Sequence, residues 1–99
     1  MILHFDTHAK FIASSWVGEG DQDFVEINNK DVAASVIEKD SKIVVLVHNH
    51  PSGDPSPSES DLTATKSLVE ISHMIAIPII DHIILGDQSY FSFKEHKLL

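Results

Sequence analysis

The side chains of His48, His50 and Asp61 lie in one short segment and are of the types that bind metal ions. The apolar run 43–47 directly before them predicts a buried strand. Side chains two residues apart on a strand point to the same face, so His48 and His50 should face one ion together, with Asn49 turned away. Two imidazoles and one carboxylate leave one position of a tetrahedral zinc ion for water, which is the ligand pattern of a catalytic zinc site.

The segment between the histidines and Asp61 predicts a loop followed by the start of a helix. Residues 52–57 contain one glycine and two prolines, which disfavour both helix and central strand. Ser58, with Asp61 three residues later, has the spacing of a helix N-cap and an acidic first turn. A capping role alone would explain both residues, but the two histidines just upstream favour Asp61 as a third metal ligand.

The same residues resemble the zinc motif of the JAB1/MPN/Mov34 metalloenzymes, known as the JAMM motif. Their order and spacing match it in full, at His48, His50, Ser58 and Asp61. The resemblance implies that His48, His50 and Asp61 bind Zn²⁺ and that Ser58 helps to stabilise the oxyanion. It further implies a metallopeptidase or isopeptidase-like hydrolase that acts on a peptide or protein.

Within this superfamily the chain looks like the RadC-type proteins of bacteria. The similar segments are 48–58, 81–84 and 89–93, and the likeness extends over nearly all of the chain. It implies an α/β fold of the MPN, cytidine-deaminase-like type. RadC-type proteins carry a DNA-repair label, which we treat as a family label only.

The resemblance also implies a glutamate that acts as general base, and no glutamate of the chain matches it. By the family's pattern this residue would precede Met1, so we expect a domain that is short at its N-terminus. The first three glutamates come too late: Glu19, Glu26 and Glu38. A general base typically contributes about 10²- to 10⁴-fold to the rate. The alternative function is therefore a catalytically impaired, MPN-type binding or scaffold module, whose exposed sheet edge pairs with another chain or a second copy.

The other segments predict a mixed, twisted sheet with two principal flanking helices. We expect strands at 2–5, 11–16, 24–27, 43–47, 79–85 and 89–93, a surface loop at 18–23, and helices from Asn28 or Asn29 to about Glu38 and from Ser58 to just before Pro78. The residues expected on the inner helix faces are Val32, Val36 and Ile37, then Leu62, Thr65, Leu68, Val69 and Ser72. In the last strand, Phe91 and Phe93 should form the buried face.

Polar side chains outside the motif have structural explanations. We expect His4 at a sheet edge, His8 in a turn and His73 near a helix C-terminus, where an imidazolium suits the dipole. His82 is best explained as a buried histidine that is hydrogen-bonded within the sheet, with a fourth ligand or a ligand-orienting residue as alternatives. Asp81 should either orient a zinc-bound imidazole or cap a neighbouring loop.

Length and charge limit the remaining choices. A chain of 99 residues predicts one domain, 1–99. Fifteen acidic residues against seven lysines, without any arginine, give a net charge of −8, so we expect no nucleic-acid binding by this chain alone. The chain has no apolar run long enough to span a membrane, no basic signal-peptide start and no cysteine. We therefore expect a cytoplasmic protein.

Overall fold

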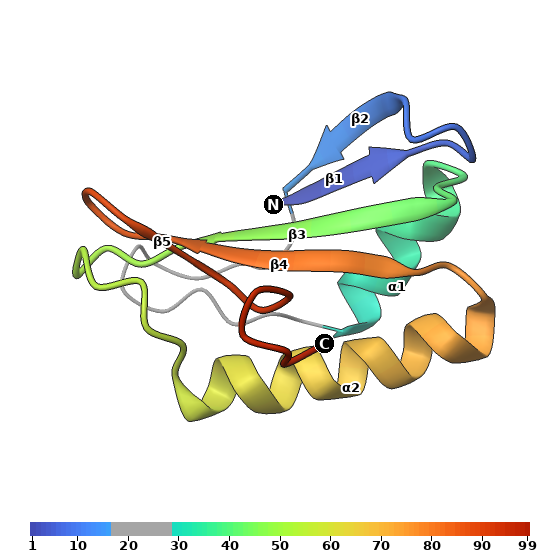
Figure 1. The fold of residues 1–99 in the computed structure, drawn as a ribbon. Helices are drawn as coiled ribbons and strands as arrows, with labels where there is room; N and C mark the ends of the chain where they lie inside the picture. Colours follow the sequence, from blue (N-terminus) through green and yellow to red (C-terminus); the bar gives the residue numbers. More distant parts are fainter. Residues whose placement is uncertain (17–28) are drawn as a thin grey trace.

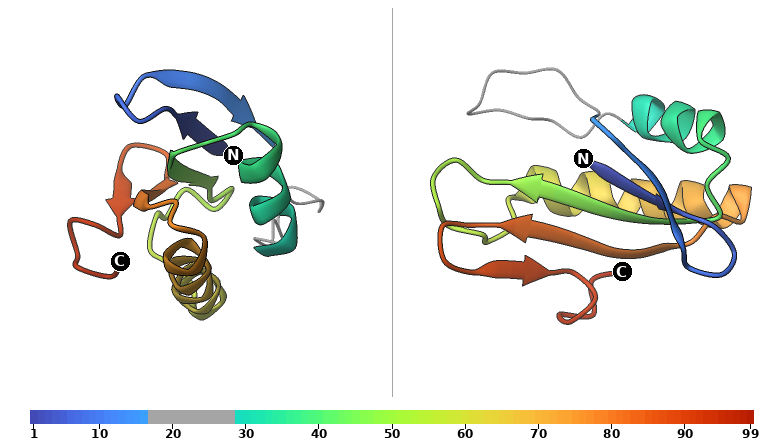
Figure 2. Two further views of the ribbon diagram at one scale, coloured as in Figure 1. Left: turned by 90° about the vertical axis from the view of Figure 1, so that its right-hand side faces the viewer. Right: turned by 90° about the horizontal axis from the view of Figure 1, so that it is seen from above.

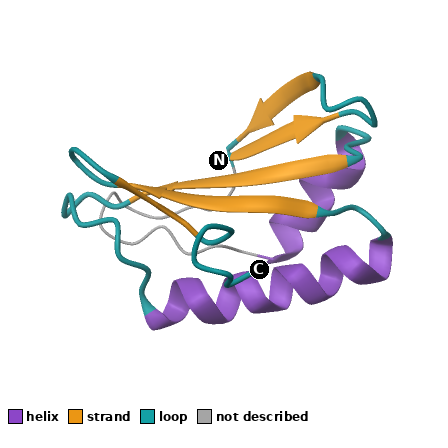
Figure 3. Cartoon of the chain, in the orientation of Figure 1, coloured by secondary structure: helices purple, strands orange, loops and turns teal. Residues whose placement is uncertain are grey.

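The computed structural model describes residues 1–16 and 29–99 and shows a five-stranded mixed sheet with two helices (Figures 1 and 3). The elements are β1 (Ile2–Phe5), β2 (Phe11–Ser15), α1 (Asn29–Glu38), β3 (Ile43–Asn49), α2 (Glu59–Ile75), β4 (Ile79–Leu85) and β5 (Tyr90–Ser92). The expected α/β architecture is confirmed. The loop predicted at 18–23 and the strand at 24–27 lie outside the described residues. Neither of these helices is long and apolar enough to cross a membrane.

The strand order is β2-β1-β3-β4-β5, and only β3 and β4 run parallel. Parallel neighbours need a crossover connection, which α2 supplies between them. Both helices pack against one face of the sheet, whereas no helix of the described chain covers the other face (Figure 2). The crossover fixes the position of the site, because the loop that leaves β3 must descend from the sheet to the start of α2.

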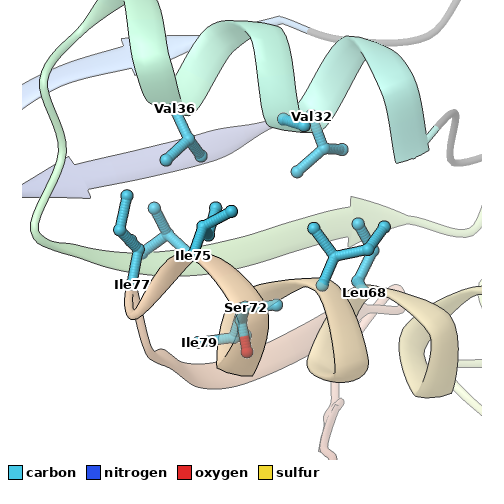
Figure 4. Close-up of a pocket in the computed structure, with 10 residues that line it drawn as sticks. Val32, Val36, Leu68, Ser72, Ile75, Ile77 and Ile79 are labelled. Carbon is cyan, nitrogen blue, oxygen red and sulfur yellow. The ribbon is translucent and has the colours of Figure 1, made fainter.

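The core lies between the two helices and the inner face of the sheet. Its buried members are Ile2, Val32, Val36, Val44, Leu46 and Leu68. An apolar crevice lies between α1 and α2 beside this core, and Val36, Ser72 and Ile77 are among the residues that line it (Figure 4). Valines 32 and 36 are four residues apart and share one helix face, as expected.

Two residues expected in the core are exposed. Ile37 is 70% exposed, because one residue after Val36 the helix has turned its side chain away from the sheet. Leu62 is exposed for the same reason, since it directly follows the inward-facing Asp61. The buried stripe of α2 therefore consists of Asp61, Thr65, Leu68 and Ser72.

The expectation that His4 lies at a sheet edge is wrong. β1 is an interior strand between β2 and β3, and His4 is fully buried on it. Its Nδ1 contacts the Ser41 hydroxyl and its Nε2 lies 2.8 Å from the Ser15 hydroxyl. The interior position of β1 arises from its long-range pairing with β3, which a local pattern does not reveal. His8 lies in the exposed turn of that hairpin, as predicted.

β5 is shorter than the strand predicted at 89–93, and its buried side chain is that of Ser92 instead of Phe91. β5 ends at Ser92, which is buried because its hydroxyl donates to Asp81 Oδ2 at 2.7 Å. Phe93 follows the strand and is fully buried, while Phe91 is only half-buried. The chain then turns back under the sheet, with Leu98 N donating to Phe93 O at 2.8 Å.

Candidate metal centre

The end of β3 places the two histidines of the motif on the same face of the sheet. The His48 and His50 rings lie 4.8 Å apart, centroid to centroid, at 87° to one another, and Asn49 between them is exposed. His50 stands just past the end of β3, where its backbone N donates to Leu85 O at 3.0 Å. The continued pairing with β4 preserves the alternation that brings the two rings together.

The first turn of α2 brings Asp61 between the two rings. Asp61 Oδ1 lies 3.9 Å from His48 Nδ1, and Asp61 Oδ2 lies 3.0 Å from His50 Nε2. One ligand atom from each of the three residues lies within 4.8 Å of the others. The side chains are largely buried, with 8% of Asp61, 10% of His48 and 17% of His50 exposed. The structure therefore assembles the three predicted ligand residues.

Asp61 is also part of the cap at the start of α2. It is therefore both a capping residue and a member of the group with His48 and His50. Ser58 is the N-cap of α2, and its hydroxyl accepts from Asp61 N at 3.0 Å. Asp61 Oδ2 in turn accepts from Ser58 N at 2.9 Å, which completes a capping box. The cap fixes the rotamer of the carboxylate and so holds it toward the histidines. The Ser58 hydroxyl accepts in this bond and keeps its own O–H for donation.

The loop after His50 fixes the orientation of that imidazole. His50 Nδ1 lies 3.0 Å from Asp54 O, and a carbonyl only accepts, so Nδ1 carries the proton and donates. Nε2 faces Asp61 Oδ2 at 3.0 Å, which is a second acceptor, so either a proton or a metal ion must lie between these two atoms. A metal ion there would give the arrangement of metal-bound histidines whose other nitrogen donates to a carbonyl. This backbone partner was not predicted, because nothing in the sequence marks a carbonyl as a hydrogen-bond acceptor for a particular side chain.

Two glycines allow the same loop to pack on the turn between β4 and β5. Gly53 has φ +87°, and its carbonyl accepts from Asp87 N at 3.0 Å. A Cβ at Gly86 would lie 2.4 Å from Gly53 O, far inside van der Waals contact. The close approach of the two turns holds the loop that carries Asp54 at a fixed distance from the sheet.

The charge states of the cluster suit a divalent cation. Burial lowers the pKa of His48 below its ordinary value, and although Asp61 opposes this, the ring favours its neutral form. Burial raises the pKa of Asp61, but hydrogen bonds from Ser58, together with the positive charge that His48 and His50 carry when protonated, outweigh burial, so that this pKa lies below its ordinary value. Neutral imidazoles and an ionised carboxylate are the forms that bind metal.

The donor set and its spacing fit zinc. Zinc takes imidazole nitrogen and carboxylate oxygen at about 2.0–2.2 Å in tetrahedral geometry, which places neighbouring donors about 3.3 Å apart. The two separations that involve Asp61, 3.0 Å and 3.9 Å, lie on either side of that distance, and all three ligand atoms lie within 4.8 Å of one another. Among residues 1–16 and 29–99 the group contains no fourth ligand residue. A tetrahedral ion held by these three residues would have one further position for water or substrate.

Asp81 and His82 are neighbours on β4, and neither is part of the cluster. Asp81 caps the turn after β5, because its Oδ1 accepts from Lys94 N at 3.1 Å and its Oδ2 accepts from Ser92. Of its two predicted roles, the cap is the one observed. His82 is fully buried and hydrogen-bonded as expected, but its partner is Thr65 of α2 at 2.7 Å and not a group of the sheet. Thr65 follows Asp61 by one helical turn, so the helix period could have identified it.

Comparisons with known proteins agree with these observations. A family model described as "RadC-like JAB domain" matches residues 1–98. The "UPF0758 protein" of Alkaliphilus oremlandii is 42% identical over 98 residues, which is 99% of this chain and 42% of that protein. The UPF0758 proteins of Methanosarcina mazei and Pelobacter propionicus are 40% and 35% identical, over 94% and 100% of this chain and 41% and 43% of theirs. The chain thus spans less than half the length of these curated relatives.

Proposed function

Since the chain belongs to the RadC-like JAB domain family, we propose that it is a zinc-dependent hydrolase of the metallopeptidase or isopeptidase type, acting on a peptide or protein. The observation that carries this proposal is the grouping of His48, His50 and Asp61, whose ligand atoms lie within 4.8 Å of one another. The net charge of −8 favours a protein substrate over a nucleic acid. We propose that residues 1–99 act as a single domain.

Each residue of the site has a separate task in this proposal. His48, His50 and Asp61 hold the zinc ion, and Asp54 O keeps the His50 lone pair directed at it. When bound, zinc supplies Lewis acidity, which lowers the pKa of a water molecule and generates a nucleophile near neutral pH. The Ser58 hydroxyl lies at the same helix start and can donate to an oxyanion as negative charge develops on the substrate carbonyl.

Proton transfer is assigned to no residue of the described chain. In residues 1–16 and 29–99 the cluster includes no glutamate. Glu19 and Glu26 lie outside the described residues. A group that takes up the proton from water and delivers it to the leaving nitrogen would add about 10²- to 10⁴-fold to the rate.

Metal content tests the proposal most directly. We expect the purified chain to hold about one zinc ion, as measured by elemental mass spectrometry, and the double variant His48→Ala/His50→Ala to hold none. The matched control is His8→Ala/His73→Ala, which removes two exposed histidines away from the cluster and should keep the metal. A folded wild-type chain without zinc, or a control that loses it as well, would contradict the proposed site.

A second candidate function is a protein-binding module, and the edge of the sheet favours it. Among the strands of residues 1–16 and 29–99, β2 is the last on its side of the sheet, and Phe11, Ile12 and Trp16 in or beside it are exposed, Trp16 by 84%. Unpaired edge strands with apolar side chains pair readily with another strand. We propose that a second copy of this chain occupies the edge in an antiparallel β2–β2 contact.

Analytical ultracentrifugation over a range of concentrations tests this contact. We expect a concentration-dependent dimer in the wild-type chain and a monomer for Ile12→Lys, because lysine on an edge strand opposes pairing. Lys66→Ala, an exposed change on α2, should leave the dimer intact. A wild-type chain that stays monomeric at all concentrations would exclude this candidate and leave the hydrolase proposal unaffected.

A further inference from the structure

We propose that His82 is a positioning residue of the metal site, and that its Nε2 holds a buried water molecule against His48. This inference rests on the proposed function, because it assigns a role to His82 in orienting one of the three ligands. The His82 imidazole is held at Nδ1 by Thr65, and at Nε2 it has no partner in the described part of the chain.

His82 is fixed by contacts from two other elements. Its Nδ1 lies 2.7 Å from the Thr65 hydroxyl on α2, which sets the position of the ring relative to the helix that carries Asp61. Its ring stacks on that of Phe93, with centroids 4.4 Å apart and planes 12° apart, and its backbone O accepts from Phe93 N at 3.0 Å. The ring cannot turn to find another partner without giving up these contacts.

The other ring nitrogen of His82, Nε2, is a buried polar atom. His82 is fully buried, and its Nε2 has no hydrogen-bond partner among residues 1–16 and 29–99. Buried polar atoms in folded proteins are nearly always paired, either with the protein or with ordered water. A small polar molecule bound at Nε2 would satisfy it, and water is the smallest that can both donate and accept.

The register of the sheet places the His82 ring beside that of His48. β3 and β4 are parallel, with Leu46 opposite His82 and His48 opposite Ile84, so His82 and His48 lie on the same face of neighbouring strands. Their ring centroids are 6.2 Å apart, and no direct hydrogen bond joins the two rings. Rings at this separation are within reach of one bridging water molecule, and we place that molecule at His82 Nε2.

The second nitrogen of a metal-bound histidine usually has a hydrogen-bond partner, and the two histidines of the cluster differ in this respect. His50 has Asp54 O. For His48, no described residue provides a carbonyl or carboxylate beyond Asp61, which is itself a proposed ligand. A water molecule held by His82 would orient His48 as Asp54 O orients His50.

Two substitutions separate the outer nitrogen of His82 from the rest of the ring. His82→Asn keeps a group near Nδ1 for Thr65 but removes Nε2, whereas His82→Gln places an amide near Nε2. We expect His82→Asn to weaken the binding of Co²⁺ and Zn²⁺ by about 10- to 100-fold and to change the visible spectrum of the Co²⁺ form. His82→Gln should recover most of the affinity and restore the spectrum.

The readouts distinguish this inference from the proposed function. Affinities come from competition with a chromophoric chelator, and circular dichroism and thermal unfolding show that each variant is folded. Wild-type affinity and spectrum in a folded His82→Asn variant would overturn the role of His82. If the wild-type chain binds neither ion, the proposed function fails and the role of His82 toward a metal is overturned with it. In a chain that binds metal, a high-resolution crystal structure tests the water molecule directly. A water molecule bonded to both His82 Nε2 and His48 supports the inference, and a dry Nε2 overturns it.

Discussion

Replacing Asp61 with asparagine should abolish stoichiometric zinc binding and also weaken the start of α2, whereas Ser58→Ala should only weaken the helix. The Asp61 carboxylate faces both imidazoles and also completes the capping box with Ser58. Loss of a residue outside the ligand shell typically costs metal affinity about 10- to 100-fold, so loss of a direct ligand should cost more than about 100-fold. Loss of the Ser58 hydroxyl should lower the free energy of unfolding by about 1 kcal/mol. Asp61→Asn keeps an acceptor oxygen for Ser58 N and loses only the negative charge in the first turn, so it should lower the free energy of unfolding by about 0.3–1 kcal/mol.

The measurements are a zinc titration against a competing chelator and urea unfolding of the metal-free chains. Glu59→Gln is the matched control, because it removes one exposed acid from the same first turn but lies outside the cluster. Its zinc affinity should remain close to that of the wild-type chain. Zinc binding by Asp61→Asn at wild-type affinity would rule out this carboxylate as a ligand. A loss of zinc in Ser58→Ala would show that the cap is needed to hold Asp61 in place.

The parts of the site that could be predicted are those set by short periods along the chain. Alternation on β3 brought His48 and His50 to one face, and the spacing from Ser58 to Asp61 identified both the helix start and the carboxylate that joins the two histidines. The apolar run before His48 identified the strand that delivers it. Each of these inferences depends on neighbours within a few residues, for which the backbone geometry is nearly fixed.

The parts that could not be predicted depend on which elements become neighbours. His4 was expected at an edge and lies in the interior because β1 pairs with both β2 and β3. The Asp54 carbonyl, the hydroxyl of Thr65 and the ring of Phe93 support the site through contacts that only the folded chain creates. Asp81 illustrates the same limit, since its carboxylate turned out to bind the chain after β5 and not an imidazole.

Between pH 6.5 and about 4, the metal-free chain should lose stability because His82 is buried in its neutral form. The pKa of His82 is lowered from 6.5 to about 4, mainly by burial. The charges of His48 and the N-terminal amine contribute to this lowering, while Asp61 and Asp81 oppose it. In the unfolded chain the ring takes up a proton near pH 6.5, so below that pH the unfolded state binds more protons and gains stability. The free energy of unfolding should fall by about 3 kcal/mol in total, and this loss is complete near pH 4.

Urea unfolding of metal-free wild-type chain and His82→Gln across this pH range would measure the effect. Glutamine does not titrate, so the free energy of unfolding of the variant should fall less steeply as the pH is lowered. Burial also lowers the pKa of His4, so both chains should retain a smaller decline of the same sign. Asp61 acts in a different window, since its lowered pKa confers stability that is lost only below its ordinary value of 3.8. Equal slopes for the two chains above pH 4 would show that His82 is not the group responsible.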